Sequence, residues 1–455
     1  MTFLSGFCCE HFLIKKVTLY VNYNKYDKGG MICSFAPTMF VIIINHVKLF
    51  SVKFSCFGIM SGFCCKQGPT NRGTPFLNAD GWLAGKRVDD NTDGLWRIHD
   101  ELYDLNKFDH PGGKFWIEMS QGTDITELFE SSHPNIEKAK QLLPKYLARK
   151  VDPKQGRNTS ALTFHPDGFY CTLRSRVWEV LKNNGGGAAS WDMLAFHDIL
   201  LLTVLSTLAC MMLPLYDDPA CWVTIAFVGG FLLSCLGSVG HNFFHHKDNW
   251  RMYSWDLTLY SSYEWRITHG YSHHNYPNSI LDFEISAMEP FIYWLPEEKN
   301  AIRRTFSFVF LQILSCLAMF IQFSSRYFAA LIGRKKLRPE NLIPLCLFVF
   351  LWLVRSATVL HATGMLPAAS PWSALQPVLL LSLRETFHRL VVMYILCSWV
   401  FHNVSLSAGH HHPSIWHEGD LITKEMDFGV FQVGPISGAT ASALSLSVLA
   451  DFLTD

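Results

Sequence analysis

Apolar residues are distributed unevenly along the 455-residue chain. Beyond Phe196 they gather in long runs, which cover about 197–216, 222–240, 304–332 and 343–361, with a fifth, charge-interrupted run at 378–402. An α-helix needs roughly 20 apolar residues to cross a bilayer, so each run is close to the required length. The pattern therefore predicts a water-soluble front half and an all-α, multi-span membrane domain behind it.

The front half carries shorter periodic segments. Strand-like runs occur at 95–98 and 102–105, and helical pieces follow at 125–130 and 136–143. Short strands mixed with short amphipathic helices are typical of a small α+β domain. We expect this domain to cover residues 75–151.

Other segments have the composition of connections. Residues 1–74 show no steady periodicity and are interpreted as a leader of unknown structure. Residues 152–190 are polar and end in three glycines, which predicts a linker with a flexible break before the membrane domain at 191–432. The Ser/Ala/Leu-rich residues 433–455 form an atypical tail.

Charge indicates the surroundings of the chain. Its 38 Lys+Arg and 38 Asp+Glu residues give no basic field, so we expect no nucleic-acid partner. The loops 217–221 and 362–377 contain no Lys or Arg, whereas 333–339 contains four basic residues, which assigns the basic loop to the cytosol. The first two runs then form one hairpin and the last two another. The third run lies along the interface or re-enters the membrane.

A first pair of histidines lies in the front domain. His110 precedes Pro111 and two glycines that permit a tight turn, and His133 precedes Pro134, which stops a helix. This segment resembles cytochrome b5. The resemblance implies that His110 and His133 are the axial ligands of a haem b, which passes electrons because no position is left open for oxygen. The alternative is a turn histidine and a helix-end histidine without a cofactor.

Further histidines cluster beside the apolar runs. On a helix, positions i and i+4 share a face, so each H-x-x-x-H-H box directs two imidazoles one way. Imidazole suits iron, zinc or copper, and an electron-donor domain favours iron, because zinc is redox-inert. The clusters are the boxes His241, His245, His246 and His269, His273, His274, and a third group of His402, His410, His411 and His412. Under the predicted topology all of them face the cytosol.

Five stretches extend the resemblance: Trp250–Tyr253, Glu264–Arg266, His273–Asn278, Gly409–Pro413 and His417–Asp420. Together they resemble the cytochrome b5-related proteins of insects, a branch of the fatty acid desaturase superfamily, over about residues 74–432. The resemblance implies two iron ions held by the histidine boxes, which use dioxygen to remove two hydrogens from a fatty acyl chain of an acyl-CoA or a lipid. It also implies a cytochrome b5 reductase as electron source and location in the endoplasmic reticulum membrane.

The same resemblance implies iron ligation by all ten histidines of the three clusters. Asp282 and Glu284 have two interpretations, as carboxylates that orient imidazoles or as a solvated acidic loop, and the second is the expectation.

The family pattern ends with a further box of the form His/Gln-x-x-His-His. This sequence has no histidine after His417, so we expect a shortage of iron ligands that leaves at least one iron under-coordinated, and an inactive form of the desaturase is among the expectations. Three functions remain open: an acyl desaturase, a haem-fused lipid hydroxylase, and a non-catalytic haem-binding membrane protein.

Overall fold

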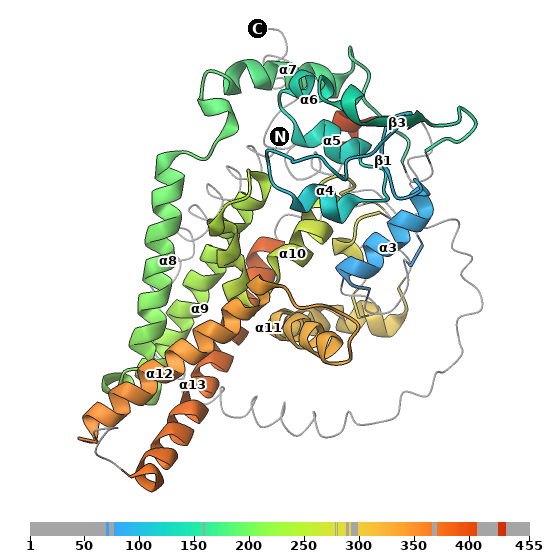
Figure 1. Cartoon of the computed structure of the whole chain (residues 1–455). Helices are drawn as coiled ribbons and strands as arrows, with labels where there is room; N and C mark the ends of the chain where they lie inside the picture. The colour runs from blue at the N-terminus through green and yellow to red at the C-terminus, as the bar shows by residue number, and fades with distance from the viewer. Residues whose placement is uncertain are drawn as a thin grey trace, which may run out of the picture. The chain divides into compact units, whose positions relative to one another are not determined.

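The computed structural model describes residues 70–71, 77–157, 160–277, 279, 281–287, 291–292, 299–365, 371–406 and 426–433, which belong to one compact unit (Figure 1). The predicted leader, apart from residues 70–71, lies outside the described residues. So do His410, His411, His412 and residues 434–455 of the predicted tail.

The front domain is built around a small antiparallel sheet. Its order is β1 (Trp96–Ile98), β2 (Glu101–Tyr103) and β3 (Leu147–Lys150), and Trp96 pairs with Tyr103 in the first hairpin. The helices of the domain are α3 (Ala79–Asp90), α4 (Phe115–Ser120), α5 (Thr126–Ser132) and α6 (Ile136–Lys140). Trp96 is 1% exposed and lies in the core between sheet and helices. The predicted α+β class is confirmed.

The segment predicted as a linker contains ordered structure. It includes β4 (Leu162–Thr163) and α7 (Phe169–Leu181), and β4 pairs in parallel with β5 (Met426–Asp427). Arg157 donates hydrogen bonds to the carboxylates of Asp124 and Glu127 in the front domain. The connector therefore packs against the domain that it follows, and the exact domain boundaries stay a prediction.

The back half is helical, as predicted. Its long helices are α8 (Trp191–Met211), α9 (Pro219–Asn242), α11 (Ala301–Leu331), α12 (Ile343–Ala362) and α13 (Trp372–Val400). In the described part of the chain, four helical segments are long and apolar enough to cross a membrane: Trp191–Met211, Pro219–His245, Ala301–Leu331 and Pro339–Ala362. Helix α13 corresponds to the predicted charge-interrupted run.

Helix starts follow local capping rules. The side chains of Ser190, Asp218 and Asn300 accept backbone N–H groups at the first turns of α8, α9 and α11, which satisfies donors that a helix leaves unpaired. Pro219 occupies the first position of α9, where its missing N–H has no cost.

Helix α13 packs against α9, α11 and α12, and α8 packs against α9 (Figure 1). The contact between α9 and α13 is close at Gly230, where an added Cβ would lie 2.7 Å from the carbonyl oxygen of Met393. Small residues permit such backbone approach between membrane helices. This contact brings the end of α13 beside the end of α9, which carries the first histidine box.

Helix α11 is seen nearly end-on in Figure 1, whereas α8 is seen from the side. It is one continuous helix of 31 residues, which removes the re-entrant alternative for the third apolar run. Its location along the interface stays a prediction.

Candidate metal and haem sites

The first histidine box lies where α9 ends. The α-helix continues through His241 and Asn242, and a short 3₁₀ turn, Phe243–His245, follows. Nε2 of His245 lies 3.2 Å from Nε2 of His241. The pairing that the i, i+4 spacing predicts is confirmed. Two imidazole nitrogens that share one metal ion at about 2.1 Å are roughly 3 Å apart, so this distance suits a shared ion.

The second box follows the short helix α10 (Ser262–Trp265) on a π-helix, Arg266–His273, rather than on the expected α-helix. The amide of His274 donates to the carbonyl of His269, five residues earlier, at 2.9 Å. The wider turn brings the rings of His269 and His274 to 4.4 Å between centroids. Short π-helical segments occur frequently at functional sites, because they rotate side chains out of the α-helical register.

The two boxes meet. The ligand atoms of His241, His245, His269 and His274 all lie within 4.8 Å of one another, and the rings of His241 and His269 are 4.6 Å apart. Nε2 of His269 is buried and has no hydrogen-bond partner among the described residues. A buried nitrogen without a partner is costly unless a metal or another ligand uses its lone pair. The group therefore fits a metal ion.

Two carboxylates contact the Nδ1 atoms of the second histidine box. Glu284 Oε1 lies 2.6 Å from Nδ1 of His269, and Asp282 Oδ2 lies 2.8 Å from Nδ1 of His273. Asp282 is only 1% exposed, so the expectation of a solvated acidic loop is wrong for these residues. His269, His273 and Glu284 also form a second group whose ligand atoms lie within 4.8 Å.

The electrostatics of this second group follow from burial and pairing. Burial opposes a charge on His273, but Asp282 and Glu284 outweigh it and raise the pKa of His273 to about 9. Burial raises the pKa of Glu284 to about 8 against the opposing effect of His273. Carboxylates that accept an Nδ1–H fix the imidazole tautomer and direct Nε2 toward a metal.

Two other predicted ligands have different surroundings. His246 contacts the ring of Phe243 and is not in either group of the described residues. Nε2 of His402 lies 2.5 Å from the hydroxyl of Tyr260, and Nδ1 lies 2.6 Å from the carbonyl oxygen of Ser398. Metal ligation by His246 and His402 stays a prediction.

The front-domain histidines face each other. The rings of His110 and His133 are 5.9 Å apart between centroids. Two imidazoles on opposite sides of one ion, each bound at about 2 Å, have ring centres roughly 6 Å apart. Nδ1 of His133 lies 2.8 Å from the carbonyl oxygen of Phe129, where an N–H donor leaves Nε2 available. Burial lowers the pKa of both histidines, and this favours the neutral form that binds metal. The pair fits a haem iron.

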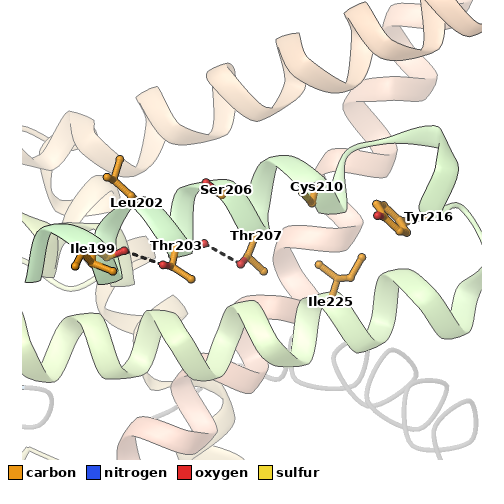
Figure 2. Close-up of a pocket in the computed structure, with 8 residues that line it drawn as sticks. All are labelled: Ile199, Leu202, Thr203, Ser206, Thr207, Cys210, Tyr216 and Ile225. Atoms are coloured by element: carbon orange, nitrogen blue, oxygen red, sulfur yellow. Dashed lines mark hydrogen bonds between the residues drawn. The ribbon is translucent and has the colours of Figure 1, made fainter. Parts of the chain in front are cut away.

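A separate cavity of about 580 Å³ opens along α8 (Figure 2). Thr203 and Thr207 donate their hydroxyls to carbonyls of their own helix, so neither hydroxyl is directed at a ligand (Figure 2). The lining residues are Ile199, Leu202, Thr203, Ser206, Thr207, Cys210, Tyr216 and Ile225. This cavity lies along a candidate membrane-spanning helix, and its lining residues belong to neither metal group.

Comparisons with known proteins agree with this division. Residues 84–152 match the family model of the cytochrome b5-like heme/steroid binding domain, and residues 218–428 match that of the fatty acid desaturases. The chain is 34% identical over 378 residues to the cytochrome b5-related protein of Drosophila melanogaster, which covers 81% of this chain and 78% of that protein. The chain belongs to the cytochrome b5-related protein family. It is thus a membrane protein in which a haem domain precedes a desaturase domain.

Two further relatives cover parts of this cytochrome b5-related chain. The cytochrome b5-related protein of Drosophila virilis is 47% identical over 116 residues, 25% of this chain and 78% of that protein. An acyl-lipid (8-3)-desaturase of Physcomitrium patens is 26% identical over 212 residues, 42% of this chain and 43% of that protein. No solved structure gives a significant match. Family membership supports an oxidoreductase of the desaturase type, with a haem and iron as the implied cofactors.

Sequence reasoning missed several residues of the cytochrome b5-related site. Tyr260 lies against His402, whereas Tyr271, within the second box, and Tyr276, just after it, donate hydrogen bonds to the haem domain. The aromatic residues beside the boxes were visible in the sequence, but their partners lie far away along the chain. Only the folded chain identifies these contacts.

Proposed function

We propose that the chain is an iron- and oxygen-dependent fatty acyl desaturase that receives electrons from its own cytochrome b5 domain. The observation that carries the proposal is the convergence of His241, His245, His269 and His274 beside the haem domain. The second group places His273, whose Nδ1 faces Asp282, beside His269, and supports a second iron next to the first. Iron bound there would supply the activation of dioxygen and the removal of two hydrogens from the acyl chain.

The residues of the chain have distinct tasks in this proposal. Glu284 and Asp282 accept the Nδ1–H groups of His269 and His273 and hold both rings in one orientation. His110 and His133 hold the haem through neutral imidazoles. A cytochrome b5 reductase supplies electrons to the haem, and an acyl-CoA or lipid is the substrate. We further propose that the protein resides in the endoplasmic reticulum membrane with both sites on the cytosolic side.

Expression in yeast followed by lipid profiling tests the function. The wild-type chain should produce a fatty acyl product with a new double bond. His269→Ala, which removes a member of both metal groups, should abolish the product, and the exposed His165→Ala should retain it. A new alcohol would establish the hydroxylase alternative instead. Unchanged lipids in cells whose protein contains both haem and non-haem iron would refute both enzymatic functions.

A further inference from the structure

The haem domain and the second histidine box share one hydrophobic core. Ile267, Tyr271 and Phe283, which come from the desaturase domain, pack in the same cluster as Trp96 and Phe129 of the haem domain. Ile267 and Tyr271 are completely buried. The segment that carries His269 and His273 is therefore part of the interface with the haem domain.

Buried polar contacts fix the orientation of this interface. The hydroxyl of Tyr271 donates to the carbonyl oxygen of Asp124 at 2.9 Å and lies 2.7 Å from the hydroxyl of Thr123. The hydroxyl of Tyr276 donates to the Glu127 carboxylate at 3.0 Å. Buried hydrogen bonds are directional, and a rotated arrangement would leave these groups unpaired at a cost of about 1–3 kcal/mol each.

The loop that carries His110 is bonded directly to the segment after the first histidine box. The backbone N–H of Asp248 donates to the carbonyl oxygen of Gly112 at 3.0 Å. Gly113 has a φ of +120° and lies against the Asp248 carboxylate, where an added Cβ would be 2.0 Å from Oδ2. Gly112 is two residues from His110, and Asp248 is two residues from His246. One hydrogen bond thus connects the loop of a haem-ligand histidine with that of a box histidine.

Arg266 holds the same loop from the second box. Its guanidinium donates to Asp248 Oδ1 at 2.7 Å and lies 3.8 Å from the ring centre of Phe115 and 4.8 Å from that of Trp116. Phe115 and Trp116 belong to α4, which lies beside α10 (Figure 1). Trp116 in turn packs against Gly270, where an added Cβ would lie 2.9 Å from the indole ring. Arg266 is 3% exposed, so its planar group is an integral part of the interface.

We propose that Asp248, Arg266 and Gly270 form a clasp that holds the haem loop and α4 against both histidine boxes and so positions the haem for electron transfer. This role rests on the proposed function. The formation of each double bond consumes one dioxygen and removes two hydrogens from the acyl chain. The haem delivers two electrons, one at a time, and returns to the ferric state after each transfer. These two electrons and two protons from water complete the reduction of dioxygen to two waters. Arg266 is a positioning residue in this scheme.

Arg266→Lys tests the clasp in the full-length protein in detergent. Lysine keeps the charge but lacks the planar group that lies over Phe115 and Trp116. The matched control is Arg149→Lys, which alters a half-exposed arginine paired with Asp93 on the surface of the haem domain. Trp116→Phe provides a second variant, which removes the contact with Gly270 and keeps the hydrogen bond between Arg266 and Asp248.

The first measurement is hydrogen–deuterium exchange of the Asp248 amide, and the second is the rate of haem oxidation by dioxygen after photoreduction, with an acyl-CoA present. Both clasp variants should retain haem, exchange faster at Asp248 and oxidise haem at least roughly tenfold more slowly, because a loosened interface no longer holds the haem in the productive orientation. Arg149→Lys should match the wild type.

Unchanged exchange at Asp248 in both folded variants would overturn the clasp. Faster exchange with wild-type haem oxidation would overturn its positioning role. A wild-type chain that forms no product and oxidises haem at the same rate with and without acyl-CoA would refute the proposed function, and exchange alone would then decide the existence of the clasp.

Discussion

The substitution Asp282→Asn removes the carboxylate that orients the ring of His273 and leaves the imidazole itself in place. Asp282 Oδ2 lies 2.8 Å from Nδ1 of His273, and Oδ1 accepts the backbone N–H of Glu284 at 2.9 Å. Asparagine has nearly the same shape but only one carbonyl oxygen, so one of these two N–H groups must face its NH₂ group. The change therefore disturbs either the ring of His273 or the backbone that presents Glu284.

The expected loss is substantial because the contact is buried. Removing a carboxylate that orients a metal-binding histidine typically costs about 10–100-fold in metal affinity. At about 1.4 kcal/mol for each factor of ten, the loss corresponds to roughly 1.4–2.8 kcal/mol. Haem content should not change, since Asp282 has no role in the His110–His133 pair.

The assay is competition for Fe²⁺ between the purified full-length chain and a chelator of known affinity. Asp100→Asn is the matched control, because the side chain of Asp100 is 94% exposed on the haem domain. Wild-type iron affinity in Asp282→Asn, with the protein folded, would show that His273 does not belong to an iron site.

Three further changes have defined outcomes. His133→Ala should abolish the Soret absorbance of bound haem, and retained haem would contradict axial ligation. Burial would raise the pKa of Glu130, but hydrogen bonds, including one from Arg174, lower it to about 2. The stabilising effect of the ionised Glu130 is present above the ordinary pKa of 4.5 and is lost as pH falls toward 2. In Glu130→Gln the fraction of protein that loses haem should therefore depend less steeply on pH in this range. Tyr260→Phe removes the hydrogen bond to His402 and should lower stability by about 1 kcal/mol, measured by thermal unfolding, and an unchanged midpoint would contradict that contribution.

The sequence could predict those features that depend on short-range spacing. The apolar runs indicated the membrane helices, and the i, i+4 spacing of His241 and His245 predicted the observed pairing. The π-helix at the second box was not predictable, because hydrogen bonds from residue i to i+4 and to i+5 suit the same short segment. Tyr271, within this π-helix, bonds to Asp124 of the haem domain, a contact that the local sequence does not indicate.

The surroundings of the two carboxylates beside the second box were predicted wrongly for a related reason. Asp282 and Glu284 have the composition of a solvated loop, and only their approach to His273 and His269 gives them a structural role. The contact between Asp248 and Gly112 joins residues of different domains. Periodicity carries no information about such a contact, because it depends on how the two domains pack.

The central claim is that imidazoles from both boxes hold non-haem iron beside the haem domain. Its most direct measurement is the ratio of total iron to haem in purified wild-type protein and in His269→Ala, since His269 belongs to both metal groups. We expect iron in excess of haem in the wild type, and a ratio near one in the variant with its haem retained. An equal excess of iron in both proteins, or no excess in an iron-reconstituted wild type, would contradict the claim.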